Sequence, residues 1–433
     1  MKQDSEKEES SQLNRDLSRH NMWYGILHGA FFHAATAFAD PYVVLPLFLA
    51  GFTDSRAIIG FVVSLIQAMS VLPQIAMARL IRRRPGSARP LMLVGIWTRC
   101  GVWGLIAAGA LLMPKESIWI LIVFIFFVSV YSLGGGIAVL PFKHVISTTI
   151  PAEFRSTLFG WRLLSGGSLA VLAGLVVKYI LGSDTLTWPR NYGALFALSF
   201  VSLAVAYTAM SQFRFLKNRG QTHLAELPPL FQELVHVRRH YPISLRLIGV
   251  RLLCGGLPLV LPFLTLYATR EVGVPLAWVG VYIAVQKAAM ILSNFAWMPL
   301  GNRCGTRAVI LPGLALALAS LGVIFFSTSA FSIAIAFGFA GAGMSAMLVG
   351  FNGYILEIGT PEIKPLLFAL EGTLLMPVYF MPLLGGWLAD AWGYRAVVVV
   401  GCVLLIGALG AGFTLCEPRK GDAACGPREP DLA

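Results

Sequence analysis

The chain has 433 residues, of which 57% are hydrophobic and only 12% are charged, and its formal net charge is +12. A water-soluble protein carries about 25% charged residues, so the composition excludes an ordinary soluble domain and predicts a surface that faces lipid. Most Lys and Arg fall in the tails, in alternate loops and at the helix ends beside them, which is the asymmetry of the positive-inside rule. The positive charge therefore indicates orientation, with both termini in the cytoplasm, and not a nucleic-acid partner.

The apolar runs, taken in chain order, predict twelve membrane crossings. Residues 1–22 mix acids and bases and predict a disordered cytoplasmic tail. Each following run reaches the length of about 20 residues that a helix needs to cross a bilayer. The runs are 23–50, 57–78, 91–113, 117–141, 157–181, 192–211, 247–268, 277–300, 308–328, 329–356, 365–388 and 395–416.

These runs are continuous and not alternating, so they predict helices and not barrel strands. The polar segment 212–246 divides them into two groups of six. We therefore expect an all-α integral membrane protein with an N-terminal six-helix bundle at 23–211, a cytoplasmic linker at 212–246, a C-terminal six-helix bundle at 247–416 and a cytoplasmic tail at 417–433.

Two pairs of loops indicate that the halves are repeats of one another. An Arg-rich segment at 82–89 follows the second helix, and Gly301-Asn302-Arg303-Cys304-Gly305-Thr306-Arg307 follows the eighth. Similar segments at 150–155 and 360–364, each with a Pro and an acid, precede the fifth and eleventh helices. Both pairs are separated by about 210–220 residues, the length of one half, so a duplicated bundle is expected.

Over about 390 residues, this arrangement resembles the major facilitator superfamily of secondary transporters. The segment 301–307 is similar to the family's loop signature, with Arg303, Gly305 and Arg307 in place and Asn302 where the family usually has an acid. The segment 382–390, PLLGGWLAD, is similar to a pattern at the outer end of the eleventh helix. The resemblance implies two pseudo-symmetric bundles, transport by alternating access, and a gating role for these loop residues.

Charged residues inside the predicted helices are costly in lipid, so each needs an explanation. Asp40 precedes Pro41 in the first helix, and His33 lies two turns earlier on the same face. A carboxylate with a nearby imidazole can take up and release a proton, so we expect Asp40, His33 and Glu371 of the eleventh helix to couple transport to protons. The alternative is that Asp40 caps a helix broken at Pro41.

Lys287 lies near the centre of the eighth helix, where an ammonium group cannot easily reach the interface. We therefore expect Lys287 to contact an anionic solute in a water-filled cavity. The alternative is that it forms a permanent ion pair with Asp40 or Glu371. Polar residues on neighbouring predicted helices are expected to help bind the solute, namely Gln67, Asn294, Asn352 and Tyr354.

Three arginines complete the charged set. Arg162 and Arg251 lie about one turn inside the cytoplasmic end of their helices, so we expect each either to extend its side chain to the membrane interface or to form part of an inner gate. Arg99 is expected to have a structural role, bonded to backbone carbonyls or to acids in the loops. His28 is expected to be structural. The deep bases outnumber the acids Asp40 and Glu371, which favours an anionic solute.

The predicted function is secondary active transport of a small solute, an organic anion, across the cytoplasmic membrane by a proton-coupled monomer. Its expected partners are the solute, the lipid bilayer and protons. The alternatives are an exporter of drugs or amphiphiles and a transporter-like sensor or assembly factor. The sequence has no HExxH or GxSxG motif, so we expect neither an enzyme nor a cofactor or metal site.

Overall fold

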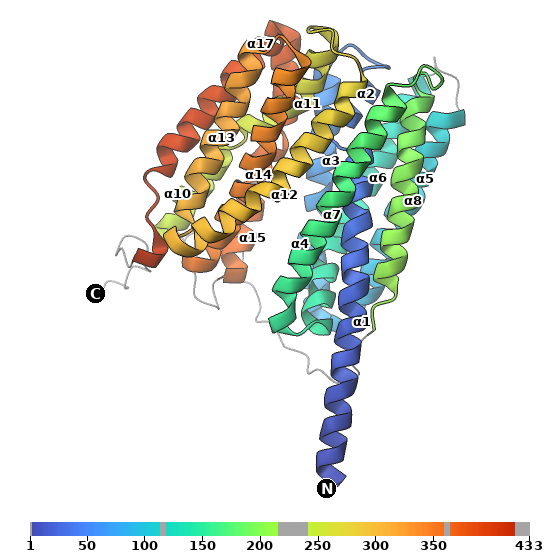
Figure 1. Ribbon diagram of the computed structural model, residues 1–433, viewed down its shortest axis with the longest axis vertical. Helices are drawn as coiled ribbons and strands as arrows, with labels where there is room; N and C mark the ends of the chain where they lie inside the picture. Colours follow the sequence, from blue (N-terminus) through green and yellow to red (C-terminus); the bar gives the residue numbers. More distant parts are fainter. Residues whose placement is uncertain (1, 113–117, 215–240, 359–363, 421–433) are drawn as a thin grey trace. The chain divides into compact units, whose positions relative to one another are not determined.

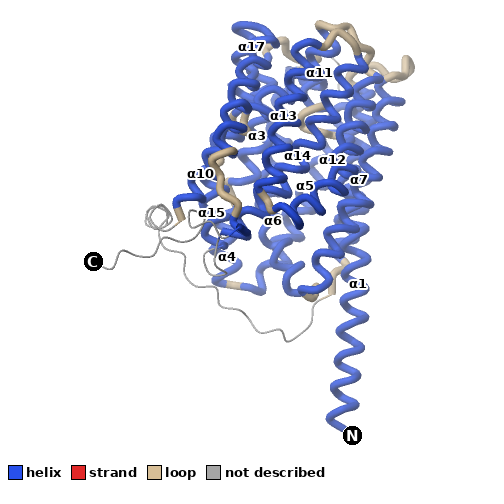
Figure 2. The backbone as a smooth tube through the Cα atoms, turned by 60° about the vertical axis from the view of Figure 1, so that its left-hand side comes forward, coloured by secondary structure: helices blue, strands red, loops and turns tan. Residues whose placement is uncertain are grey.

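The computed structural model describes residues 2–112, 118–214, 241–358 and 364–420. Within these residues the chain folds into helices and connecting turns, with no strand (Figure 2). An all-helical backbone satisfies its own hydrogen bonds without water, which is the requirement for crossing lipid. The all-α membrane fold predicted from the sequence is confirmed.

The chain divides into two compact units, and the division is not a simple cut at the linker. Unit 1 comprises residues 1–40 and 69–224, and unit 2 comprises residues 41–68 and 225–433. The stretch from Pro41 to Ala68, which includes parts of the first two predicted crossings, therefore belongs with the second half. Bundle boundaries at 211 and 247 remain a prediction.

Unit 1 is built around α1, which packs against α7 and α8, while α5 packs against α6 and α8 (Figure 1). Its helices are α1 (Lys2–Phe38), α4 (Gln74–Arg83), α5 (Ala88–Leu112), α6 (Ile118–Thr149), α7 (Ala152–Leu181) and α8 (Arg190–Ser211), with the short turn η1 (Pro85–Ser87) between α4 and α5.

Unit 2 has α14 at its centre, in contact with α12 and α13, while α17 packs against α10, α11 and α13. Its elements are α2 (Val44–Leu49), most of α3 (Arg56–Val71), α10 (Pro242–Leu253), α11 (Gly256–Arg270), α12 (Ala277–Cys304), α13 (Arg307–Phe326), α14 (Ala330–Ile358), α15 (Lys364–Leu374), α16 (Met376–Tyr379), α17 (Met381–Gly412) and η2 (Pro418–Lys420).

The helices are consistent with the twelve predicted crossings, although several are interrupted. Among the described residues, ten spans are long and apolar enough to cross a membrane. The first crossing is the apolar end of α1 followed by α2, and the eleventh is α15, α16 and the first part of α17. Gly393, at a positive φ of 80°, ends the eleventh crossing inside α17 and the twelfth begins beyond it.

The amino-terminal segment differs from its prediction. Residues 2–22 were expected to be a disordered tail, but α1 begins at Lys2 and runs without a break into the first crossing. The segment is rich in Glu, Lys, Gln, Arg and Leu, which have high helix propensity. It also continues a helix that is already formed, so it does not bear the cost of nucleation.

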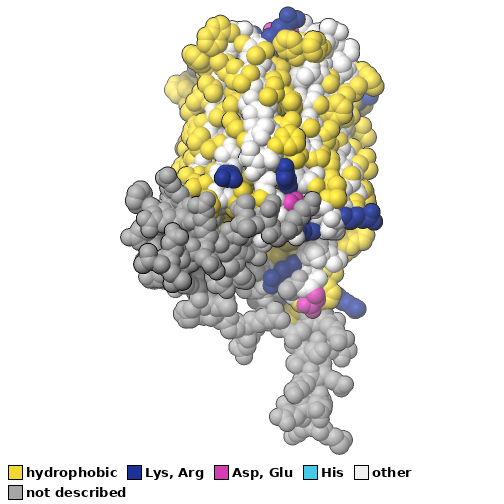
Figure 3. All heavy atoms as spheres, turned by 90° about the vertical axis from the view of Figure 1, so that its left-hand side faces the viewer, with side chains coloured by type: hydrophobic (Ala, Val, Ile, Leu, Met, Phe, Trp, Pro, Cys, Tyr) yellow, Lys and Arg dark blue, Asp and Glu magenta, His cyan; other side chains and the backbone are white. Residues whose placement is uncertain are grey.

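Side chains on the outer surface have the distribution that lipid requires. The face in Figure 3 is largely hydrophobic along its middle, with Lys and Arg gathered toward its two ends. Large apolar side chains such as Trp119, Phe295 and Phe331 are more than half exposed. Such extensive exposure of large apolar residues is unfavourable in water and normal for a surface in contact with acyl chains.

Candidate functional site

Unit 1 holds a group of basic side chains that we call the basic cluster: the buried His28 of α1 and Arg162 of α7, and the half-buried His33 of α1 and Arg99 of α5. Arg162 Nη1 donates to the carbonyl oxygen of Gly25 at 2.6 Å and lies 2.9 Å from His28 Nδ1. His28 is 6% exposed and Arg162 is 9% exposed. Arg162 therefore links α7 to α1 inside the bundle and does not reach toward an interface.

Glycine is required where α1 and α7 approach each other at this cluster. A Cβ atom at Gly29 would lie within 3 Å of the Cβ and Cγ atoms of Arg162. A Cβ atom at Gly166 would meet the ring of His33 and the carbonyl oxygen of Gly29. The two glycines thus give the two basic side chains the space that they occupy between the helices.

Arg99 has different partners from those expected. Its Nη2 donates to the hydroxyl of Tyr131 at 2.6 Å, and its guanidinium lies over the rings of Tyr131 and Phe32, at 4.3 and 5.5 Å from their centroids. The predicted bond to carbonyls or loop acids is therefore wrong. Aromatic faces attract a guanidinium that has lost its water, so they replace those partners here.

The electrostatic surroundings of the cluster are basic. The charged groups that act on His28 are Arg162, His33 and Arg99, with no acid among them. In the crossings of unit 1 that the structure describes, acids occur only at helix ends, at Asp40 and Glu153. The deep charge of unit 1 is thus positive.

Asp40 lies at the break between α1 and α2, where the backbone is not helical, and is 4% exposed. Because α1 ends at Phe38 and α2 begins at Val44, the run expected as one helix at 23–50 is interrupted at Asp40-Pro41, as the alternative interpretation of Asp40 requires. The chain passes from unit 1 to unit 2 at this point.

Unit 2 holds one buried ion pair that the sequence did not predict. Glu371 of α15, with a side chain 7% exposed, pairs with Arg251 of α10, whose guanidinium also lies 5.1 Å from the ring centroid of Phe351. From the sequence, Glu371 was a candidate partner of Lys287, but its partner is Arg251. The reason is that α10 and α15 are packing neighbours, which residue spacing alone does not reveal.

Lys287 is half-buried on α12, next to Gln286, which is 2% exposed and lies 3.9 Å from the sulfur of Met344. Gln67 Nε2 donates to the hydroxyl of Tyr42 at 2.6 Å, within the segment of the first half that belongs to unit 2. These polar side chains are held in place by protein partners.

Three further residues predicted to bind the solute have local partners. Asn294 and Asn352 each donate to the carbonyl oxygen four residues earlier, that of Met290 at 2.6 Å and that of Leu348 at 2.8 Å. Tyr354 is fully buried, and its hydroxyl donates to the carbonyl oxygen of Cys416 at 2.8 Å. These bonds show how the three side chains are held, and a role for them in solute binding stays a prediction.

The predicted gating residues Asn302, Arg303, Gly305 and Arg307 lie around the loop that joins α12 to α13: Asn302 and Arg303 are in the last turn of α12, and Arg307 begins α13. Gly305 ends α12 at φ 92°, a conformation that side chains disfavour. The backbone nitrogen of Arg307 donates to Glu417 Oε2 at 3.1 Å, and Arg307 Nη2 donates to the carbonyl oxygen of Phe413 at 2.9 Å. The loop is thus tied to the segment that follows α17.

A second acid holds the other side of the same loop. Glu357, at the end of α14, accepts from Thr306 Oγ1 at 2.8 Å and from Arg419 Nε at 2.8 Å. Arg419 also donates to the carbonyl oxygens of Gly301 and Asn302. Glu357 and Glu417 therefore supply the negative charge that the loop lacks at Asn302. They were missed because neither belongs to the loop signature; their positions, directly after a crossing, were the available signal.

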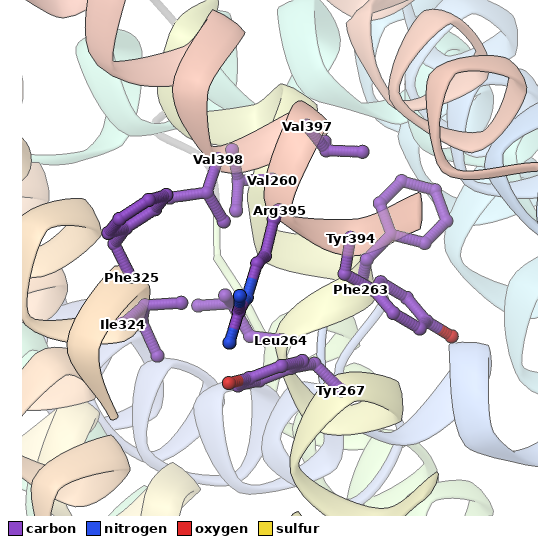
Figure 4. Close-up of a pocket in the computed structure, with 10 residues that line it drawn as sticks. All are labelled: Val260, Phe263, Leu264, Tyr267, Ile324, Phe325, Tyr394, Arg395, Val397 and Val398. Atoms are coloured by element: carbon purple, nitrogen blue, oxygen red, sulfur yellow. The ribbon is translucent and has the colours of Figure 1, made fainter. Parts of the chain in front are cut away.

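One pocket lies in unit 2 where α11, α13 and α17 meet (Figure 4). Arg395 points into it beside Tyr267, and the remaining lining is mostly aliphatic or aromatic, including Phe263, Phe325 and Tyr394. None of the predicted solute-binding residues lines this pocket.

These features define a polytopic helical membrane protein with charged side chains buried inside its helical units. Residues 247–429 match the sequence family described as the Major Facilitator Superfamily. Among curated proteins, no sequence matches the chain.

Solved structures with the same fold are transporters. A mutant of the nucleoside transporter NupG aligns with a TM-score of 0.66 at 10% identity, over 93% of this chain and 100% of that one. A D-xylose-proton symporter aligns with a TM-score of 0.65 at 14% identity, over 94% and 98%. An auto-inhibited POT family peptide transporter aligns with a TM-score of 0.65 at 10% identity, over 91% and 96%.

At these identities the structural likeness defines the fold, and the sequence match covers the second half. Together they support a Major Facilitator Superfamily transporter with no subfamily assigned: the family match is direct for residues 247–429, and the fold agrees over the whole chain. The family predicted from the loop at 301–307 is confirmed.

Proposed function

We propose that this protein is a proton-coupled secondary transporter of a small organic anion, working as a monomer in the cytoplasmic membrane with both termini inside. The observation that carries the proposal is the sign of the buried charge. Arg99 and Arg162 of unit 1 have no acid among their partners in the described structure, whereas Glu371 of unit 2 is neutralised by Arg251. A positive interior favours an anionic solute, because unlike charges attract strongly in a low dielectric.

Interrupted helices at corresponding positions support alternating access. The first crossing is broken around Asp40-Pro41, and the seventh is broken at Cys254-Gly255, between α10 and α11. The two breaks are about 210 residues apart, the same interval as the sequence repeats. Discontinuous helices at equivalent places in two repeats are typical of solute and ion sites in secondary transporters.

For proton coupling we propose Asp40, assisted by His33 and Glu371. Asp40 is a buried carboxyl at one helix break, and Glu371 on α15 pairs with Arg251, three residues before the other. Protonation of Glu371 would release Arg251, and this release would change the charge near that break. Solute contacts are proposed for Lys287, with Gln67, Asn294, Asn352 and Tyr354 in support.

The test is uptake by the purified protein in liposomes, with labelled small carboxylates, phosphate, cations and neutral solutes compared at equal concentration. We expect anions to be taken up fastest, with a rate that depends on an imposed pH gradient. Lys287→Ala should lower anion uptake at least tenfold, and Asp40→Asn should remove the dependence on the gradient.

Lys178→Ala and Asp184→Asn are the matched controls, because both side chains are exposed on unit 1 away from the buried charges. Both should transport like wild type. A preference for cations, combined with an unimpaired Lys287→Ala variant, would rule out the anion proposal.

A second candidate is transport of a drug or amphiphile, which the aromatic rings of Phe32 and Phe142 beside the guanidinium groups of unit 1 favour. In the same liposomes, a neutral amphiphilic dye would then be moved faster than any carboxylate. Its transport would be insensitive to Lys287→Ala.

A further inference from the structure

The basic cluster of unit 1 has more hydrogen-bond donors than acceptors. Arg162 uses only Nη1 for its bonds to Gly25 and His28, so its Nε and Nη2 make no hydrogen bond to the described residues. Arg99 uses Nη2 for Tyr131, and its Nε is buried with no acceptor in that part of the chain. The buried Nε of Arg99 costs free energy, because it has lost its contact with water and has gained no acceptor among the described residues.

An unused hydroxyl lies in the same place. Tyr207 of α8 is 1% exposed, and within the described structure its hydroxyl has no hydrogen-bond partner. Its ring contacts that of His28 at 6.1 Å between centroids, and it interacts electrostatically with Arg99. The hydroxyl is thus a further unused donor in the surroundings of Arg99 and His28.

Aromatic rings join these groups into one environment. The ring of Phe32 lies 5.7 Å from that of His28 and 5.5 Å from the guanidinium of Arg99, and Phe142 lies 5.6 Å from His28 and 5.2 Å from the guanidinium of Arg162. Arg99 keeps part of its side chain accessible. The cluster therefore combines two planar cations and a buried hydroxyl with an apolar, aromatic surround.

We propose that Arg99, Arg162 and the hydroxyl of Tyr207 form the binding site for the carboxylate of an aromatic or apolar organic acid. A carboxylate accepts hydrogen bonds at two oxygens and matches the planar fork of a guanidinium. It would use the free donors and neutralise the cluster. An organic carboxylate is favoured over a small hydrated ion because its body can pack against the rings that surround the charges.

The inference rests on the proposed anion transport, and it names the class of anion and the residues that bind it. Sequence reasoning assigned Arg162 to an inner gate and Arg99 to a scaffold bond, and it assigned solute binding to Lys287. In the present proposal, unit 1 supplies the groups that hold the anionic end of the solute.

The experiment measures ligand binding to the purified full-length protein in detergent, by calorimetry and by the shift in melting temperature. The probes are benzoate, its neutral analogue benzamide, acetate and inorganic phosphate, at constant ionic strength. We expect benzoate to bind more tightly than acetate or phosphate, and benzamide not to bind.

Arg99→Gln and Arg162→Gln should each weaken benzoate binding at least about tenfold, since each removes a charge-assisted hydrogen bond. Tyr207→Phe removes only the hydroxyl and should weaken binding about two- to tenfold with little effect on folding. Arg162→Lys keeps the charge and should bind better than Arg162→Gln.

The matched control is Arg155→Gln. Arg155 also lies on α7 and also donates to backbone carbonyls, those of Ile150 and Ser147, but it is outside the cluster. It should bind benzoate like wild type. The melting temperature without ligand identifies any variant that fails to fold, and Tyr207→Phe keeps the test decisive in that case.

Three results overturn the inference, and they are distinguishable. If wild type binds benzoate and the Arg99, Arg162 and Tyr207 variants bind it equally well, the anion proposal stands and this site is wrong. If phosphate binds better than benzoate, the site takes a different class of anion. If no anion binds while cations do, the proposed function itself fails.

Discussion

At the scale of single residues, the pair of Arg251 and Glu371 is the clearest case in which buried charges balance each other. The carboxylate is almost fully buried and the guanidinium is one quarter exposed. Desolvating two charges is expensive, so such a pair adds little net stability, but removal of one partner leaves the other uncompensated.

We expect Glu371→Gln and Arg251→Gln each to destabilise the protein by roughly 1–3 kcal/mol, below the value for fully buried pairs because Arg251 is partly exposed. The double variant should be less destabilised than the sum of the two by about 0.5–3 kcal/mol, which a double-mutant cycle of thermal unfolding would measure. Lys287→Gln tests the pairing of Lys287 with Glu371 that the sequence suggested. The losses of stability caused by Lys287→Gln and Glu371→Gln should be additive in the double variant. Coupling of Glu371 to Lys287 and not to Arg251 would contradict the structure.

At the scale of elements, unit 2 depends on close contact between α3 and α17. Asp390 of α17 accepts from the backbone nitrogens of Arg56 and Ala57, at 2.9 Å each, and so caps α3 with an acid from a distant segment. Gly386, one turn earlier on α17, lies against the backbone of Arg56 and Ala57. A Cβ atom there would meet main-chain atoms, which cannot move aside as the end of a side chain can.

Gly386→Ala should therefore destabilise unit 2 by about 1–3 kcal/mol through overpacking, and lower the melting temperature by several degrees. Gly410→Ala is the matched control, because Gly410 is also in α17 and has open space where its Cβ would be. It should be neutral or slightly stabilising, since Ala is the better helix former. Equal losses in both variants would show that the contact with α3 does not limit stability.

The predictable part of the fold is the part that depends on local composition. The crossings expected at 192–211, 308–328 and 329–356 end within two residues of α8, α13 and α14, because continuous apolar runs bounded by polar residues leave few alternatives. The crossing expected to end at 141 continues to Thr149, because Pro141 is accommodated inside α6, as prolines in membrane helices often are. Side-chain partners were less predictable.

Which side chains meet depends on the rotation of each helix and on which helices are neighbours. Glu371 is a chemically plausible partner for Lys287, yet it meets Arg251 because α15 packs on α10. Arg99 was expected to find oxygen acceptors on the backbone or on loop acids and instead meets Tyr131 and Phe32. Individual residues of the candidate site were found from their cost in lipid, but their pairing required the tertiary structure.

At the scale of the whole molecule, the chain changes from one unit to the other at interruptions in its helices. It leaves unit 1 after Asp40, in the gap between α1 and α2, and returns at Met69, beside the gap between α3 and α4 at Pro73. Such short non-helical segments absorb changes in φ and ψ, so they are suited to act as hinges between units that move.

Replacement of the proline at the second hinge tests this role. Pro73→Ala restores a backbone donor and removes the steric block, so α3 and α4 should join into a straighter and stiffer helix. If movement of the units limits turnover, transport should slow several-fold while the affinity for the solute stays within about twofold, because no solute contact is removed. The measurement is the initial rate of uptake in liposomes, together with ligand binding in detergent.

Pro312→Ala is the control, because Pro312 lies inside α13 and wholly within unit 2, and it should transport at the rate of wild type. An equal loss of rate in both variants would assign the effect to helix straightening in general, and an unchanged rate in Pro73→Ala would exclude this position as a hinge that limits the cycle.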